Sequence, residues 1–526
     1  MHTLYSFIPA WYSDPGMVKP AAFWASYTDG MEFDDTVNQL RVFTAAGEST
    51  ELLLLGCMPE LRHFMHRQGL EGTKVWSAFD VIQGIRLRAA GMMSYLDFNW
   101  RDDIEWFHTP FLTAGFLGDK LLCKVYYGIG GHAVRLEWFD NDVLFRSDEI
   151  DDRGFISYRT FFEEGTAVRR VYYSDRVKPR IIENILTGEV GVCRDSAGCF
   201  DRKAYRCIGD LVEEVLQKHL AAERVKDGRE IIAAYDERHN DLLCRAAENV
   251  KISFSFFSQR NKPENIVRGD PAVARAAAIV TDTERLADAV RAVCPEKADA
   301  IMDISPYDTR LSPGTSGNIR ELKILFYIED WHDAGWRGYL EKILAFMGSR
   351  PHTRLTVGLG KGCEGKVNET GVRQELAKLM ETQGLDFAFE NGDKTIVIEN
   401  EDEPEIIERI FIRNCRSELD MMGLMADHRL IVDTDPNPAL YLQIAGVSAC
   451  VPLILTRPSR YVENGGNGLI VGSPQELPGA LGYFLDGLAN WNRAFVASLG
   501  KISQYTDGSL VKKWKRATGG ADIIPQ

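Results

Sequence analysis

The segment RLIVDTDPNPALYLQIAGVSACVPLILTRPSRYVENGGNGLIVGS, residues 429–473, alternates short apolar runs with one helical pattern. The apolar runs are Leu430–Val432, Val451–Leu455 and Leu469–Val471, and the helical spacing falls in Leu440–Ala449. Continuous apolar runs that alternate with a helix are typical of parallel strands buried on both faces. Ligands of such sheets bind beyond the carboxyl ends of the strands, so we expect any site here near Asp433–Asn437.

The length and composition of the chain indicate a multidomain globular protein. At 526 residues the chain is too long for one ordinary core, and we expect two or three domains. Hydrophobic residues make up 45% and charged residues 26%, as in most soluble proteins. A formal net charge of −15 and a pI near 5.3 argue against nucleic-acid binding.

The compartment is predicted from what the sequence lacks. No run of about 18 uncharged apolar residues indicates a membrane-spanning helix. The first residues have no basic start and include Asp14, unlike a signal peptide. The ten cysteines contain no CxxC pair, and Cys193, Cys199 and Cys207 are too widely spaced for a zinc knuckle. The sequence therefore predicts a cytoplasmic protein with reduced thiols and no bound cofactor.

The first half of the chain changes its pattern partway along. A βαβαβ order, with a helix at Phe33–Phe43 and a strand at Leu52–Leu55, predicts half of a doubly wound sheet. From Leu121, short alternating runs with acidic turns predict an antiparallel meander inserted into that domain. The predicted parts are 1–118 (start of an N-terminal Rossmann-like domain), 119–205 (β insertion), 206–315 (remainder of that domain and linker) and 316–526 (C-terminal Rossmann-like domain, terminal helix and basic tail).

The α/β pattern restarts after a Pro/Gly/Ser-rich linker at 303–317, and Ala-rich helices are expected before it, between 268 and 294. The predicted elements of the second domain are strands at 323–328, 354–359 and 396–398 and helices at 336–347, 372–379 and 479–499. Two Rossmann-like halves joined by a linker are the architecture of GT-B glycosyltransferases.

A glycine-rich turn, Gly358-Leu-Gly360-Lys361-Gly362, directly follows one predicted strand. Such a turn can bring backbone N–H groups close to a nucleotide pyrophosphate, with Lys361 adding a positive charge. Glycines also simply make tight turns, and a lone glycine motif is weak evidence for a ligand. We favour the structural interpretation.

Two further positions bear on a nucleotide-sugar site. In retaining GT-B transferases, two glutamates separated by seven residues bracket a turn and helix; the later one binds the ribose hydroxyls and the earlier one faces the donor sugar. This sequence resembles that pattern in its helix and glycine turn but has Asp435 and Gln443 at the two positions. Asp435 is one methylene shorter, and Gln443 lacks the charge that makes such hydrogen bonds about twice as strong. The pattern predicts a degenerate donor site and a pseudoenzyme.

Two other groups of residues have a functional and a structural interpretation. His63 and His66 stand three residues apart, but no carboxylate completes a metal site with them or with His332 and His352, so surface histidines are favoured and no metal is predicted. The basic tail with its tryptophan could contact anionic lipid headgroups or form a solvated end. The tail residues are Lys512, Lys513, Trp514, Lys515 and Arg516.

The N-terminal segments FIPAWY (Phe7–Tyr12) and MEFDDTVNQLRVF (Met31–Phe43) resemble the start of the first accessory secretory protein of the bacterial accessory Sec system. The likeness extends over the β insertion, the GT-B halves and the altered donor motif. It implies a cytoplasmic component, peripheral at the inner face of the cell membrane, without demonstrated transferase activity and in contact with acidic phospholipid.

The implied partners are the second and third accessory secretory proteins and the second SecA motor ATPase, and the implied cargo is a serine-rich repeat glycoprotein adhesin. The alternative is an active retaining GT-B glycosyltransferase that modifies a Ser/Thr-rich protein, for which Asp435 and Gln443 would have to suffice. A third interpretation is a peripheral membrane module that uses the basic tail.

Overall fold

A computed structural model of the chain describes residues 3–13, 16–23, 34–222, 228–310, 312–333, 335–390, 408–415 and 417–518. These residues form two compact units. The first unit contains the described residues up to Pro306 together with 511–518, and the second spans Tyr307–Leu510.

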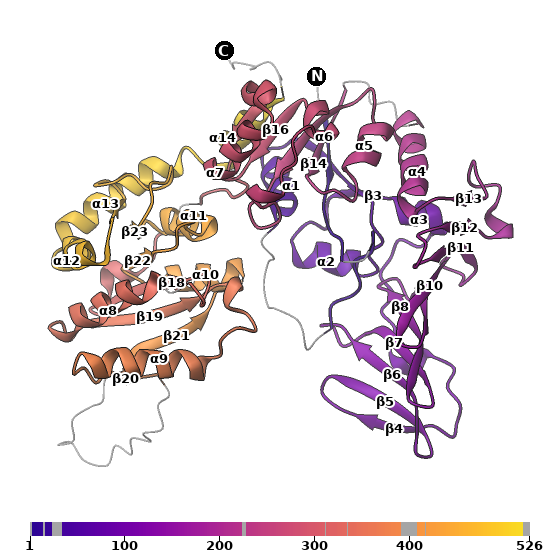
Figure 1. The fold of residues 1–526 in the computed structure, drawn as a ribbon, viewed down its shortest axis with the longest axis horizontal. Coiled ribbons are helices and arrows are strands. Elements are labelled where there is room, and N and C mark those ends of the chain that lie inside the picture. Colours follow the sequence, from indigo (N-terminus) through magenta and orange to yellow (C-terminus); the bar gives the residue numbers. More distant parts are fainter. Residues whose placement is uncertain are drawn as a thin grey trace. The chain divides into compact units, whose positions relative to one another are not determined.

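The first unit is built on a seven-stranded parallel sheet with the order β17-β16-β15-β14-β1-β2-β3 (Figure 1). Its strands are β1 (Leu4–Ile8), β2 (Ser49–Leu54), β3 (Lys74–Ser77), β14 (Arg229–Ala234), β15 (Lys251–Phe256), β16 (Ala278–Thr281) and β17 (Ile301–Asp303). Its helices are α1 (Asp35–Ala45), α2 (Leu61–Arg67), α3 (Ala78–Gln83), α4 (Ile208–Ala222), α5 (Asn240–Ala246), α6 (Pro271–Arg275) and α7 (Glu284–Val293). The chain reverses its direction of winding between β1 and β14, which is the doubly wound order that the sequence predicts.

Local sequence explains where the helix α1 begins. The side chain of Asp34 accepts a hydrogen bond from the backbone N–H of Val37 at 2.9 Å, so it caps the helix. Helix prediction is wrong farther on, because the run between 268 and 294 contains the buried strand β16 between α6 and α7. A four-residue apolar run inside Ala-rich sequence does not distinguish a buried strand from a helix. β17 ends at Asp303, the first residue of the predicted linker.

The inserted sheet has ten antiparallel strands in the order β13-β12-β11-β10-β9-β8-β7-β6-β5-β4. They are β4 (Glu105–His108), β5 (Leu112–Leu117), β6 (Lys120–Tyr127), β7 (Ala133–Asp140), β8 (Val143–Asp151), β9 (Phe155–Glu163), β10 (Thr166–Tyr173), β11 (Pro179–Asn184), β12 (Val190–Val192) and β13 (Ala204–Tyr205). Neighbours in sequence are neighbours in the sheet, as in a meander, and the long strands extend from the Rossmann-like sheet in Figure 1. The sheet begins at Glu105, so both β4 and β5 lie before the predicted boundary at 119.

Buried side chains and one ionic cluster attach this meander to the rest of the first unit. Tyr172 and Ile181 are fully buried in the unit's main hydrophobic core. The guanidinium of Arg153 donates to Asp151 at 2.6 and 2.8 Å and to Asp80 at 2.9 and 3.0 Å, which joins β8 to helix α3. Burial raises the pKa of Asp151 to about 6, although the bonds from Arg153 oppose the shift.

The second unit repeats the parallel design with the strand order β20-β21-β19-β18-β22-β23-β24. Its strands are β18 (Leu322–Ile328), β19 (Thr353–Leu359), β20 (Ala388–Phe389), β21 (Glu408–Asn414), β22 (Leu430–Asp433), β23 (Leu453–Leu455) and β24 (Gly468–Ile470). Its helices are α8 (Gly335–Gly348), α9 (Glu369–Thr382), α10 (Glu418–Met425), α11 (Leu440–Ala449), α12 (Leu477–Leu485) and α13 (Leu488–Ile502). The segment quoted first therefore forms β22, α11, β23 and β24, as predicted.

Two predicted elements of the second unit do not match its secondary structure directly. The strand predicted at 396–398 lies outside the described residues. The long helix predicted at 479–499 is two helices, α12 and α13, because Gly487 takes an extended conformation (φ −176°, ψ 158°) between them.

The basic tail forms the helix α14 (Asp507–Ala517), and its tryptophan is not exposed. Trp514 is 2% exposed, and its ring lies edge-on to Phe43 at a centroid distance of 6.2 Å. The ammonium group of Lys515 pairs with Glu48 at 2.6 Å. A headgroup-contacting role for Trp514 is therefore wrong for this conformation, whereas Lys512 and Arg516 are exposed. Within the described part of the chain, no helix combines the length and the apolar character needed to cross a bilayer.

Candidate functional site

The candidate donor site lies in the second unit, at the carboxyl edge of its sheet. The order of connections reverses between β18 and β22, and ligands of doubly wound sheets bind at such a point. β22 ends at Asp433, whose side chain is fully buried. Its two carboxylate oxygens accept hydrogen bonds from the backbone N–H groups of Asp435 at 3.0 Å and Ala439 at 2.8 Å. Asp433 therefore fixes both ends of the loop that leads into α11.

The electrostatic environment of Asp433 is unusual for a carboxyl group. Burial raises its pKa from 3.8 to about 7, and the negative charges of Asp435 and Glu329 add to the shift. The two backbone hydrogen bonds act in the opposite direction but do not cancel the loss of hydration. A shifted carboxyl group at a sheet edge marks a candidate site, although here both oxygens already serve the loop.

Asp435, the first predicted donor-site position, also bonds to its own loop. Its carboxylate accepts a hydrogen bond from the N–H of Asn437 at 2.7 Å. The hydroxyl of Thr456 donates to the backbone carbonyls of Thr434 and Asp435 at 3.3 Å each. The loop between β22 and α11 is thus held by hydrogen bonds from its own side chains and from Thr456.

Gln443, the second predicted position, is 4% exposed on helix α11. Its amide nitrogen donates to the carbonyl of Pro438 at 3.1 Å, and its amide oxygen accepts a hydrogen bond from the hydroxyl of Ser459. Both ends of the amide are therefore engaged within the fold, where a ribose diol would need a free acceptor. The helix and the Ser459 turn are joined through the side chain that the family pattern uses for the nucleotide.

The glycines of the turn after β19 make room for neighbouring side chains. A Cβ at Gly358 would lie 2.9 Å from the sulfur of Cys415. A Cβ at Gly360 would overlap the carboxylate of Glu329 and the hydroxyl of Tyr327. Lys361 is exposed beside them. These close approaches explain why glycine stands at both positions.

The side chain of Glu329 lies against this turn. One of its oxygens accepts the N–H of Gly362 at 3.2 Å, and the hydroxyl of Tyr327 donates to the other. Burial, followed by the charge of Glu329, raises the pKa of Tyr327 far above its ordinary value. A pyrophosphate approaching these N–H groups would meet a carboxylate, and like charges at close range repel each other.

The sequence-predicted residues converge only in part. β18 lies between β19 and β22, so the glycine turn and the loop containing Asp435 flank the end of the same strand. Sequence reasoning placed Asp433 at the expected site but missed Glu329 and Ser459, which make the other decisive contacts. Each follows an apolar run or sits in a turn without a motif, and only the pairing of distant strands brings them together.

The histidines singled out by the sequence take separate places. His66 pairs with Glu71 at 2.6 Å on the surface, and the ring of His63 lies 5.7 Å from that of His132. Burial lowers the pKa of His63. His352 contacts Arg320 at 3.2 Å. In the residues that the structure describes, no three His, Cys, Asp or Glu side chains gather as a metal site.

Comparison with known proteins identifies relatives over the whole length. The family model for the first accessory secretory protein of the accessory Sec system matches residues 4–520. A relative of that description from Streptococcus gordonii is 31% identical over 98% of this chain and 98% of its own length. The crystal structure of accessory secretory proteins 1, 2 and 3 from Streptococcus pneumoniae contains a chain with 27% identity and a TM-score of 0.81, covering 98% of this chain and 99% of that one.

A more distant structure establishes the fold class. The pneumococcal O-GlcNAc transferase GtfA, solved with UDP and GlcNAc, has 11% identity and a TM-score of 0.68 over 98% of this chain and 99% of its own. At this identity the likeness concerns the fold alone. Together with the two doubly wound sheets, it makes the fold GT-B-like, as the sequence predicts.

The shifted carboxyl at the sheet edge predicts a pH dependence of stability. Between pH 4 and 7 the unfolded chain has lost the proton of Asp433 and the folded chain retains it, so unfolding releases a proton and stability falls as pH rises. Relative to Asp433→Asn, wild-type stability should therefore decline across this window by up to a few kcal/mol, since one pKa unit corresponds to about 1.4 kcal/mol. Above pH 7 the difference should level off.

The measurement is hydrogen exchange of β22 in the full chain at a series of pH values, corrected for intrinsic exchange. Ile431→Val on the same strand is the matched control, because its cost comes from lost packing and should not vary with pH. If the stability of wild type relative to Asp433→Asn stayed constant or grew as the pH rose, the raised pKa of Asp433 would be contradicted.

Proposed function

Because this chain belongs to the family of the first accessory secretory protein of the accessory Sec system, we propose that it acts as a non-catalytic component of that export machinery. In this proposal it assembles in the cytoplasm with the second and third accessory secretory proteins. The complex works with the second SecA motor ATPase, and its cargo is a serine-rich repeat glycoprotein.

The observation that carries the non-catalytic part is the use of the Gln443 amide within the fold. Its donor and its acceptor both bond to protein atoms, so the position that should hold a ribose serves the helix and the Ser459 turn instead. Glu329 supports the same conclusion, because its carboxylate lies where a phosphate would approach the glycine turn. The transferase scaffold is kept while its ligand contacts are replaced by internal ones.

The rival proposal is an active retaining glycosyltransferase that uses Asp435 and Gln443. For the proposed non-catalytic protein, thermal unfolding of the full chain should be unchanged by millimolar UDP, UDP-glucose or UDP-N-acetylglucosamine, because binding must stabilise the folded state. A GT-B transferase known to bind UDP serves as the positive control. Saturable stabilisation at micromolar ligand, or transfer of sugar to a Ser/Thr-rich peptide that Gln443→Met abolishes, would establish the rival.

Assembly and export provide the test of the adaptor role. Coexpressed with the second and third accessory secretory proteins, the full chain should elute with both as one complex. A strain lacking the chain should recover export of the serine-rich repeat protein with wild type and equally with the donor-site variant Asp435→Ala. Loss of export by Asp435→Ala, with the complex intact and its thermal stability unchanged, would show that the donor-site loop has a chemical role.

Contact with acidic phospholipid is proposed for the exposed basic residues of α14, Lys512 and Arg516, with Lys513 and Lys515 beside them. A basic residue near an anionic membrane contributes about 1 kcal/mol, so Lys512→Glu with Arg516→Glu should lower binding to phosphatidylserine-containing vesicles by about tenfold or more. Cosedimentation of the full chain measures this effect. The control, Arg176→Glu with Lys178→Glu, makes the same charge change at exposed positions of the meander. Equal losses in both variants would refute a specific role of the tail.

A further inference from the structure

The strand β4 forms one edge of the inserted sheet, at the end of the meander that lies away from the parallel sheet of the same unit (Figure 1). It pairs with β5 on one side, from Glu105 opposite Phe116 to His108 opposite Thr113. Among the described residues, no other segment forms backbone hydrogen bonds with β4. Such an edge presents a row of unpaired N–H and C=O groups to a further strand.

Contacts on one face of the sheet hold β4 in its extended conformation. The centroid of the Trp106 ring lies 4.9 Å from that of Trp100 and 5.4 Å from that of Tyr95. On the same face, Nδ1 of His108 lies 3.0 Å from the hydroxyl of Thr113 on β5. The edge is therefore preformed, which lowers the entropic cost of pairing with another strand.

The opposite face of β4 carries an exposed aromatic ring. Phe107 alternates with Trp106 along the strand and is 62% exposed. Its cross-strand partner on β5 is Ala114, whose side chain is too small to cover it. An exposed aromatic residue alone indicates little. On a free edge, however, Phe107 lies where the side chains of an added strand would pack.

The strands at the other sheet edges do not combine these features. Four of them, β13, β17, β20 and β24, have only two or three residues. The fifth, β3, has four residues, but its aromatic residue Trp76 stacks on the ring of His219 of α4, with 4.4 Å between the centroids. β4 is therefore the edge best suited to pair with a partner.

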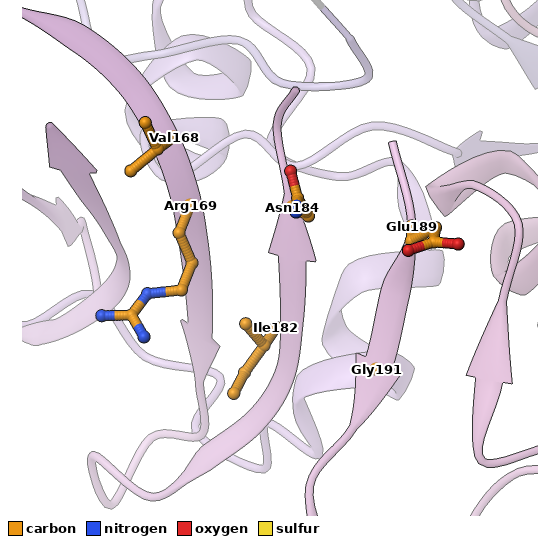
Figure 2. A pocket seen from close by; sticks show the side chains of 6 residues that line it. All are labelled: Val168, Arg169, Ile182, Asn184, Glu189 and Gly191. Atoms are coloured by element: carbon orange, nitrogen blue, oxygen red, sulfur yellow. The ribbon is translucent and has the colours of Figure 1, made fainter. Parts of the chain in front are cut away.

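The outer face of the inserted sheet offers less than its edge. An open hollow of about 300 Å³ lies there over β10, β11 and β12, lined by Val168, Arg169, Ile182, Asn184, Glu189 and Gly191 (Figure 2). The backbone of these strands is already paired within the sheet, and the guanidinium of Arg169 lies over Phe161 on β9. The hollow therefore has no free backbone groups with which to select a ligand.

We propose that β4 is a docking edge to which a partner protein adds an extended strand. The outer N–H and C=O groups of β4 pair with the backbone of that strand, as in other cases of strand addition to a sheet edge. Apolar side chains of the added strand pack against Phe107. A basic residue of the same strand lies opposite Glu105, because Glu105 and the nearby Asp102 are exposed and negatively charged.

This inference rests on the proposed function in one respect, because the partner is one of the proteins that assemble with this chain in the proposed export complex. The donor-site residues and the helix α14 take no part in it. Loss of the docking edge should therefore weaken assembly without changing the behaviour of either of those regions.

The test measures binding of the full chain to the coexpressed second and third accessory secretory proteins. Phe107→Lys should weaken binding by about tenfold or more, because it removes an apolar contact and places a charge on the edge. Leu186→Lys is the matched control. Leu186 is 66% exposed between β11 and β12 of the same sheet, so the same change there should leave the affinity unaltered. Both variants should unfold at the wild-type temperature, since both positions are exposed.

A second pair of variants tests the charge of the edge. Glu105→Lys should weaken binding most at low salt, because screening reduces the repulsion from a basic residue of the added strand. Glu189→Lys makes the same charge change at an exposed position of the same sheet and should have no such effect. Equal losses in the two variants would exclude a specific role for Glu105.

Hydrogen exchange separates strand addition from a contact made by side chains alone. The amides of Glu105–His108 should exchange more slowly in the assembled complex than in the free chain. If wild type does not bind the two proteins, the proposed function is overturned and this inference with it. If wild type binds them but Phe107→Lys binds equally well and the exchange of β4 is unchanged, only the docking edge is overturned. Protection of β4 that depends on the concentration of this chain alone would place a second copy there and would also overturn the proposal.

Discussion

Parallel strands must be buried on both faces, and this constraint organises both units. Each Rossmann-like sheet has seven parallel strands, so each strand needs a crossover connection and helices must cover the two faces. The polar backbone and side chains that cannot enter these cores collect at the carboxyl edges. If a ligand forms the hydrogen bonds of the polar groups at that edge, the scaffold can act as an enzyme. If protein atoms form them, the edge has a structural role.

In the second unit, protein atoms satisfy the groups at this edge. Asp433 holds the backbone of the loop, Gln443 joins α11 to Ser459, and Glu329 accepts from the glycine turn. A hydrogen bond to a charged group contributes about 1.5–3 kcal/mol net, so a nucleotide would have to replace several such contacts before gaining any affinity. Apolar packing holds the core strands of this unit, and of these three residues only Asp433 belongs to a strand.

The sequence predicted the parallel sheets and the meander, because apolar periodicity is a local signal, whereas Asp435 and Gln443 as altered donor positions stay a prediction. It did not reveal what those positions contact, since Glu329 and Gly362 or Gln443 and Ser459 meet only after strands pair. The tail illustrates the same limit. The lysines around Trp514 predict a helix with one apolar face. The sequence pattern does not show that this face packs against Phe43, which is far away in the chain. β16 was missed because four buried residues carry too little periodicity to be distinguished.

In the first unit, too, protein atoms form hydrogen bonds with polar groups at the carboxyl edge of the parallel sheet. Arg260 forms a bidentate pair with the buried Asp35, and Tyr12 bonds to the buried His239 at 2.9 Å. The inserted sheet is under a different constraint, because an antiparallel sheet can keep one face in solvent. Side chains on that outer face, such as Arg169 and Ile182, are exposed and do not belong to the hydrophobic core, so they can be replaced without disturbing it. A binding function can therefore be gained there while both doubly wound sheets stay closed, and Gly191, which has no side chain, leaves open space on this face.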